Sequence, residues 1–138
     1  MTEIPAAGSI PISTITGDSV IRVPADATVA DVARAIIDGE VGVVVVGDEM
    51  RPQALVSERD VVRVVAAGTD PTTLRAVDVA SKQLIWCEAD TTVDQAAAQM
   101  MDHYIRHVLV EHDDVLIGIV SARDLLGVYC ADAQDNPL

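Results

Sequence analysis

The chain contains one stretch of sequence twice. Residues 13–63, shifted by 64 positions, align with residues 77–127 without a gap, and 13 of the 44 aligned pairs from Val20 to Arg63 are identical. Many of the remaining pairs match one hydrophobic residue with another. A period this long that occurs only twice indicates a duplicated globular unit, because solenoid arrays stack several shorter repeats.

Composition restricts the kinds of partner that such a protein can have. The 138 residues suit one compact domain, and half of them are hydrophobic with no Phe, one Trp and two Tyr. The core must therefore be aliphatic, and the stacking surfaces of single-stranded nucleic-acid binders are missing. A formal charge of −13 repels nucleic acids and anionic membrane surfaces. We therefore expect neither nucleic acid nor membrane as a partner.

The sequence also favours a reduced, cytoplasmic protein. Apolar runs such as 41–46 are far shorter than the ~20 residues of a membrane helix, and the N-terminus lacks a charged region followed by an apolar one. Cys87 and Cys130 are too few and too irregularly placed for a disulfide scaffold. We expect two free thiols, with Cys87 at a buried strand position.

Each copy contains the pattern of a capped amphipathic helix. Thr28 with Asp31, and Thr92 with Gln95, have the spacing at which the third helical side chain reaches back to the cap amide. Apolar residues then recur at i, i+3, i+4, i+7 and i+8, which predicts one buried face. The predicted faces are Val29, Val32, Ala33, Ile36 and Ile37 in the first copy and Val93, Ala96, Ala97, Met100 and Met101 in the second.

Extended segments surround each helix and complete a β-α-β-β-α unit. The V-V-V-V run within 41–46 predicts a strand buried on both faces, and a second helix is expected to begin at Ser57 or Ser121. Because a lone unit of this size buries little surface, we predict one pseudo-twofold α/β module rather than two independent domains. The predicted boundaries are repeat 1 at 10–67, a linker at 68–76, repeat 2 at 77–130 and a tail at 131–138.

Short motifs that occur in both copies make the chain resemble a known family. The pattern h-h-S-x-R-D-h-h, in which h is a hydrophobic residue, occurs twice, with its S-x-R-D part at 57–60 and 121–124. Each time it lies downstream of an A-D-x-T-V segment, and I-R-H-V-L-V at 105–110 precedes the second. Together they resemble a tandem pair of cystathionine-β-synthase (CBS) domains, called a Bateman module, over roughly residues 10–130. The resemblance implies a sensor that binds AMP, ADP, ATP or S-adenosylmethionine in clefts between the repeats, commonly as a homodimer. We expect a stand-alone module, with no enzyme or channel attached.

The S-x-R-D element also has chemistry of its own. A serine at the end of a strand, where a helix begins, combines a hydroxyl with free N–H groups at the positive end of the helix dipole, which suits a phosphate. The arginine adds a charge-assisted donor, and the aspartate can accept two hydrogen bonds from vicinal ribose hydroxyls. The candidate ligand-binding residues are therefore Ser57, Arg59 and Asp60 in the first copy and Ser121, Arg123 and Asp124 in the second.

One further pair belongs to the second copy alone. Arg106 and His107 lie on a strand that leads to the second S-x-R-D element, and they resemble a basic pair that reaches a phosphate in some family members. The first copy has Gly42 and Val43 at these positions. An alternative explains S-x-x-D without any ligand: serine and aspartate form a capping box that stabilises the helix start by ~1 kcal/mol.

Other functional classes have weaker support. No G-x-S-x-G, H-E-x-x-H or P-loop motif is found, so we expect no enzymatic activity. His103, His107 and His112 are divided between a predicted helix end and a strand, which disfavours a shared metal site. The favoured function is a non-enzymatic sensor of an adenosine-type ligand, read by an unknown protein partner. The alternatives are a ligand-free structural or stress-associated interaction protein and a redox- or metal-responsive protein that uses the cysteines and histidines.

Overall fold

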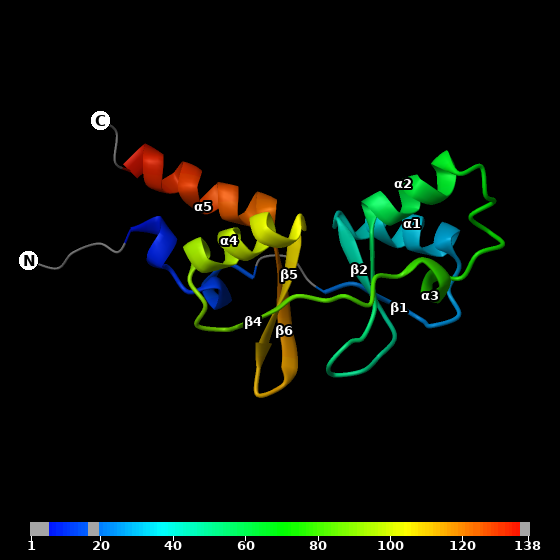
Figure 1. Cartoon of the computed structure of the whole chain (residues 1–138), viewed down its shortest axis with the longest axis horizontal. Helices are drawn as coiled ribbons and strands as arrows, with labels where there is room; N and C mark the ends of the chain where they lie inside the picture. The colour runs from blue at the N-terminus through cyan, green and yellow to red at the C-terminus, as the bar shows by residue number, and fades with distance from the viewer. Residues whose placement is uncertain (1–5, 17–19, 136–138) are drawn as a thin grey trace, which may run out of the picture. The chain divides into compact units, whose positions relative to one another are not determined.

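The computed structural model describes residues 6–16 and 20–135, and both copies have the predicted β-α-β-β-α order (Figure 1). The first copy consists of β1 (Arg22–Val23), α1 (Val29–Gly39), β2 (Val43–Val46), β3 (Leu55–Ser57) and α2 (Glu58–Ala66). The second consists of β4 (Trp86–Glu88), α4 (Val93–His103), β5 (His107–His112), β6 (Val115–Ser121) and α5 (Ala122–Asp135). The α/β fold class is confirmed. No helix in the described ranges is long and apolar enough to cross a membrane.

Each copy forms its own three-stranded mixed sheet. In the first sheet, the central strand β2 pairs in parallel with β1 and antiparallel with β3. In the second, β5 pairs in parallel with β4 and antiparallel with β6, so the strand orders are β1-β2-β3 and β4-β5-β6. All four valines of β2 are buried, with exposures between 0% and 8%. The prediction of a strand buried on both faces is therefore confirmed, and this strand anchors the core of its sheet.

Three short helical turns were not predicted. They are the 3-10 turns η1 (Ala7–Ser9) and η2 (Ile12–Thr14) and the single-turn helix α3 (Ala76–Val79). Under the 64-residue shift, η2 falls on the start of α3. Their surroundings match too, since the Val29 N–H donates to the carbonyl of Leu74 and the Val93 N–H donates to the carbonyl of Ile10, both at 2.9 Å. Equivalent hydrogen bonds thus extend the repeat back to residue 10 and to its counterpart, residue 74.

The compact units of the structure do not coincide with the sequence copies. Residues 6–16 group with 85–135, and residues 20–84 form the other unit. Ile12 is fully buried in a core that contains the second copy's Cys87, Val93 and Leu125 among others. Ala76, which precedes the second copy's strands, is fully buried in the first copy's core. Each core is thus completed by the segment that precedes the other copy's first strand.

The buried faces of α1 and α4 are narrower than predicted. Val29, Val32 and Ile36 are buried, but Ile37 is 76% exposed and its counterpart Met101 is 77% exposed. Successive residues turn by about 100° around an α-helix. Ile37, the eighth residue after Val29, therefore lies roughly 80° from Val29 around the helix and further still from the other buried residues, Val32 and Ile36. The inclusion of Ile37 and Met101 in the buried faces was wrong.

Candidate functional site

The first S-x-R-D element lies at the junction of β3 and α2. Ser57 is the last residue of β3 and the N-cap of α2, and its hydroxyl oxygen accepts the Asp60 N–H at 3.3 Å. In return, Oδ2 of Asp60 accepts the Ser57 N–H at 2.9 Å and the Ser57 hydroxyl at 3.0 Å. Oδ1 of Asp60 lies 3.5 Å from Nη1 of Arg63. Both carboxylate oxygens therefore already have protein partners.

The second element repeats this geometry where β6 meets α5. Ser121 ends β6, its hydroxyl oxygen accepts the Asp124 N–H at 3.1 Å, and Oδ2 of Asp124 accepts the Ser121 N–H at 2.8 Å. The position that corresponds to Arg63 is Gly127. Within the described residues, no side chain pairs with Oδ1 of Asp124. One carboxylate oxygen in the second copy is thus available for another hydrogen bond.

Both serines and both aspartates serve as helix caps, as the ligand-free alternative predicts. A complete capping box satisfies N–H groups at the helix start and stabilises it by ~1 kcal/mol. The two arginines have no part in these caps. Arg59 and Arg123 are exposed, and neither has an ion-pair partner among the residues that the structure describes. Capping therefore accounts for the serine and the aspartate, but not for the arginine.

Arg106 and His107 lie beside the second element. The Ala122 N–H donates to the carbonyl of Arg106 at 2.8 Å, and His107 is the register partner of Ser121 in the β5–β6 ladder. The β-sheet thus brings two residues to a helix start that follows them by more than ten positions. In the first copy, the same contacts involve Gly42 and Val43, which carry no charge.

The remaining histidines do not converge. His103 ends α4, where its Nδ1 lies 2.9 Å from the Gln99 carbonyl oxygen, and His112 lies at the end of β5 with Nε2 3.4 Å from Asp113. Across residues 6–16 and 20–135, no three His, Cys, Asp or Glu side chains are grouped in a way that could hold a metal ion.

The two cysteines differ in environment. Cys87 is buried in β4, as predicted, and Cys130 is exposed. Burial raises the pKa of the Cys87 thiol, because a thiolate is poorly solvated there. Neither cysteine is in a disulfide.

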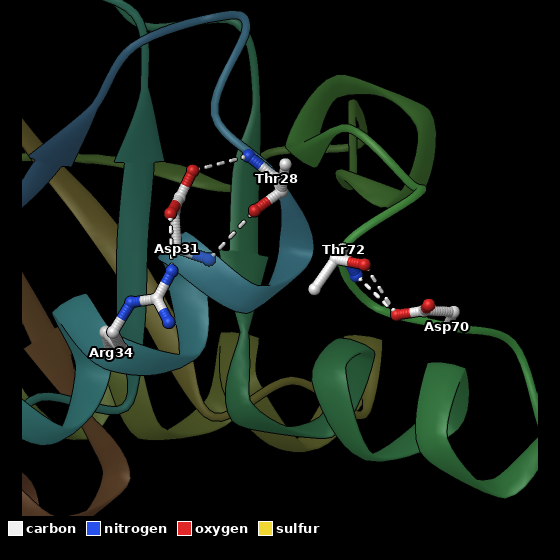
Figure 2. Close-up of polar contacts among 5 residues, drawn as sticks. All are labelled: Thr28, Asp31, Arg34, Asp70 and Thr72. Atoms are coloured by element: carbon white, nitrogen blue, oxygen red, sulfur yellow. Dashed lines mark hydrogen bonds and ion pairs between the residues drawn. The ribbon is translucent and has the colours of Figure 1, made fainter.

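Hydrogen bonds at the cap of α1 and in the turn after α2 change the pKa values of two carboxyl groups (Figure 2). Asp31 accepts the Thr28 N–H at 3.0 Å and an Arg34 N–H at 2.8 Å, and these hydrogen bonds, that from the Thr28 amide first, lower the pKa of the Asp31 carboxyl. Asp70 accepts both the N–H and the hydroxyl of Thr72, at 2.9 and 2.8 Å, which lowers the pKa of Asp70. Both carboxylates are surface groups that organise turns and helix starts.

Two side-chain contacts were not predicted from the sequence, one at the first S-x-R-D element and one between α4 and α5. Arg63 follows Asp60 by three residues, a spacing at which helical side chains meet, so that ion pair could have been anticipated. The second contact joins the hydroxyl of Tyr129 in α5 to the carboxylate of Asp94 in α4. Nothing in the spacing of Asp94 and Tyr129 predicts it, because it depends on how α4 and α5 pack.

Comparisons with known proteins agree with this architecture. An uncharacterised protein of Methanopyrus kandleri is 32% identical over 123 residues, covering 87% of this chain and 63% of that protein. A CBS domain protein from Pyrobaculum aerophilum, solved in complex with AMP, is 31% identical, with a TM-score of 0.77 over 88% of this chain and 99% of that one. A hexameric CBS-CP12 protein from bloom-forming cyanobacteria is 25% identical, with a TM-score of 0.79 over 94% of this chain and 75% of that one.

The family assignment follows from two separate matches within the chain. The chain spans less than two thirds of the length of the first curated relatives it matches. The CBS domain matches residues 12–67 and again residues 76–130, so nearly the whole chain is accounted for. The chain therefore belongs to the CBS domain family and carries two CBS domains in tandem.

Proposed function

We propose that this CBS-domain pair is a non-enzymatic regulatory sensor that binds an adenosine-containing ligand at its S-x-R-D elements. The observation that carries the proposal is the AMP complex of the Pyrobaculum aerophilum protein, which is 31% identical over 88% of this chain. AMP, ADP, ATP and S-adenosylmethionine all contain the adenosine group. The family resemblance extends the proposal to each of them.

The residues at each helix start have the chemistry that such a ligand needs. In the proposed complex, Asp60 and Asp124 accept hydrogen bonds from the ribose hydroxyls. Ser57 and Ser121 bind phosphate at the positive ends of α2 and α5. Arg59 and Arg123, which the caps do not use, supply charge-assisted hydrogen bonds to the same anion, and Arg106 and His107 add cationic or polar groups in the second copy.

The overall charge favours a ligand with few phosphates. A formal charge of −13 opposes the approach of any anion, and this repulsion grows with each phosphate on the ligand. AMP meets less repulsion than ATP without its metal ion, and S-adenosylmethionine, which has no phosphate and a net positive charge, meets none. Mg²⁺ bound to ATP would offset part of that difference.

The proposed output is a population shift read by a protein partner. A ligand that binds one conformation of the module better than another raises the population of that conformation in proportion to the difference in affinity. The partner then recognises the favoured conformation. No chemical change of the ligand is needed, so this function requires no catalytic residue.

We further infer that the protein acts as a homodimer. Ile37 of α1 and Val62 of α2 are 76% and 63% exposed, and their counterparts Met101 and Leu126 are 77% and 62% exposed. The same pair of apolar positions is therefore uncovered in each copy, which fits a self-complementary contact with a second copy of this chain. The hexamer of the cyanobacterial CBS-CP12 protein supports self-association in the family. Sedimentation of Val62→Lys with Leu126→Lys should show monomers if these helices form the contact.

Thermal-shift titration of the purified chain tests the sensor proposal. The ligands are AMP, ADP, ATP with and without Mg²⁺, and S-adenosylmethionine, because a ligand at 100 times its dissociation constant adds about 2.7 kcal/mol to stability. The double variant Asp60→Asn with Asp124→Asn retains an oxygen for each cap but loses the carboxylate charge. It should lose the shift, while the matched control Asp31→Asn, in the cap of α1, should keep it.

A second candidate is a ligand-free interaction protein, favoured by the complete capping boxes of Ser57 and Ser121. For this function the aspartates matter only for stability. The double Asp→Asn variant would then melt at a lower temperature, and no adenosine compound would shift either protein at millimolar concentration. That result would move the search to a protein partner.

A further inference from the structure

The two S-x-R-D elements differ at the positions that surround them. Arg63, which pairs with Asp60 in the first copy, is replaced by Gly127 in the second, and Glu58, directly after Ser57, is replaced by Ala122. In the β-ladder, Gly42 and Val43 beside the first helix start are replaced by Arg106 and His107 beside the second. Each of these differences changes how well an element would bind an anionic nucleotide.

The carboxylates of Asp60 and Asp124 differ in how many of their oxygens can still accept a hydrogen bond from a ligand. Oδ1 of Asp60 lies 3.5 Å from Arg63, and Oδ2 accepts both the amide and the hydroxyl of Ser57. Asp124 uses only Oδ2, for the Ser121 amide, and Oδ1 has no partner in the described part of the chain. Two vicinal hydroxyls can therefore approach Asp124 without displacing an ion pair. At Asp60 they must compete with Arg63.

The charged residues beside the two helix starts also favour an anion at the second element. Glu58 adds a negative charge at the first position of α2, next to the N–H groups that would receive a phosphate, whereas Ala122 adds none. Arg106 is exposed and its backbone carbonyl accepts a hydrogen bond from the start of α5, so a cationic residue stands beside the second element where the first copy has the uncharged Gly42. In a chain with a formal charge of −13, this placement matters for an anion.

We propose that the two elements are unequal: the Ser121–Asp124 element, with Arg106 and His107, is the tight site for a nucleoside monophosphate, and the Ser57–Asp60 element is a weaker site. This proposal rests on the proposed function, because it assumes that the S-x-R-D elements bind an adenosine compound. The open oxygen of Asp124 selects the ribose and Arg106 selects the phosphate. At low concentration the module then takes up one nucleotide per chain.

Calorimetric titration of the full chain with AMP, and in parallel with adenosine, tests the inequality. The wild type should bind one AMP tightly and a second at least about tenfold more weakly, since a contact with a charged group changes affinity by that factor or more. Arg106→Gln should weaken the tight AMP site by a similar factor and change adenosine binding little. Asp124→Asn should remove the tight phase, and Asp60→Asn the weak one.

Gly127 offers a test that does not risk the fold. It is exposed within α5, and a Cβ added there meets no atom within 4 Å. Gly127→Arg recreates in the second copy the residue that engages Asp60 in the first, so it should weaken the tight site by up to about fivefold, the range of a surface ion pair. The matched control Gly127→Ala, with the same gain in helix propensity, should leave the affinity unchanged.

The outcomes separate this proposal from the proposed function. Two AMP sites of equal affinity, or loss of the tight phase on Asp60→Asn, would overturn the inequality and leave the sensor function standing. Equal effects of Gly127→Arg and Gly127→Ala would reject the role given to the Asp124 oxygen. Absence of AMP binding by the folded wild type would overturn both proposals together.

Discussion

The hydroxyl of Tyr129 donates a hydrogen bond to the carboxylate of Asp94 and ties α5 to the first turn of α4 across 35 residues of sequence. This contact belongs to the second copy alone, because the corresponding residues of the first copy are Val65 and Ala30. The η1 turn closes over the same carboxylate, since a Cβ on Gly8 would overlap the Asp94 side chain. Asp94 thus joins three segments of one unit.

Removal of the Tyr129 hydroxyl should destabilise the protein at neutral pH but not at strongly alkaline pH. The hydrogen bond to Asp94 holds the phenol in its protonated form and raises its pKa. The stabilisation is therefore complete below the ordinary pKa of about 10 and is lost as pH rises through the higher folded value. Tyr129→Phe should lower the free energy of unfolding by about 1 kcal/mol at neutral pH, measured by urea denaturation.

The phenol itself can be followed by ultraviolet absorbance. The chain has two tyrosines, so in a Tyr104→Phe background the tyrosinate signal comes from Tyr129 alone. It should appear above the pH at which the urea-unfolded chain ionises. Coincident folded and unfolded titrations would show that the bond to Asp94 does not persist in solution.

Truncation of Ile12 tests whether the segment before the first copy's first strand completes the second copy's core. Ile12 is 0% exposed, so Ile12→Ala should cost about 2–5 kcal/mol of unfolding free energy through lost burial and a cavity. The control is Ile37→Ala, the same change at a side chain that is 76% exposed, which should fall within about 0.5 kcal/mol of the wild type. Equal costs at the two positions would contradict the packing of Ile12.

The elements that local sequence determines were predicted well. The Thr28 and Thr92 caps, the buried V-V-V-V strand and the helix starts after Ser57 and Ser121 all depend on neighbours within four residues. Hydrophobic period and capping chemistry carry that information directly. The repeat then confirmed each assignment, because two copies gave the same order of elements.

The features that were missed depend on contacts between distant segments. The sequence does not reveal that Ile12 enters the second copy's core or that Tyr129 meets Asp94, since neither pair follows a local period. The predicted faces of α1 and α4 failed at Ile37 and Met101 for a related reason. Hydrophobicity shows which side chains can be buried, and packing decides which of them are.

Thiol labelling should distinguish the two cysteines. Burial of Cys87 raises its pKa and keeps reagents away, whereas Cys130 is exposed. The Cys130→Ser variant, which retains only Cys87, should react with a disulfide reagent at least about tenfold more slowly than Cys87→Ser, which retains only Cys130. Urea should abolish the difference. Similar rates in the native proteins would place Cys87 at the surface.

Loss of the Asp31 charge should destabilise the unit formed by residues 20–84 in a pH-dependent way. The Thr28 amide, followed by Arg34, lowers the pKa of Asp31, so the folded state favours the carboxylate. Its stabilisation is present above the unfolded pKa of about 3.9 and disappears as pH falls through the lower folded value. The melting temperature of Asp31→Asn should therefore lie below that of the wild type at neutral pH, begin to approach it near the unfolded pKa of about 3.9, and converge with it below the lower folded pKa.

Asp38, in the last turn of the same helix, provides the matched control for Asp31. It is exposed and carries the same charge at the end where the helix dipole disfavours a negative group. Asp38→Asn should leave the melting temperature unchanged or raise it. If both variants fell equally, the loss would reflect net charge rather than the cap that Asp31 forms with Thr28. A difference between Asp31→Asn and wild type that persisted in acid would likewise exclude a role for the carboxylate charge.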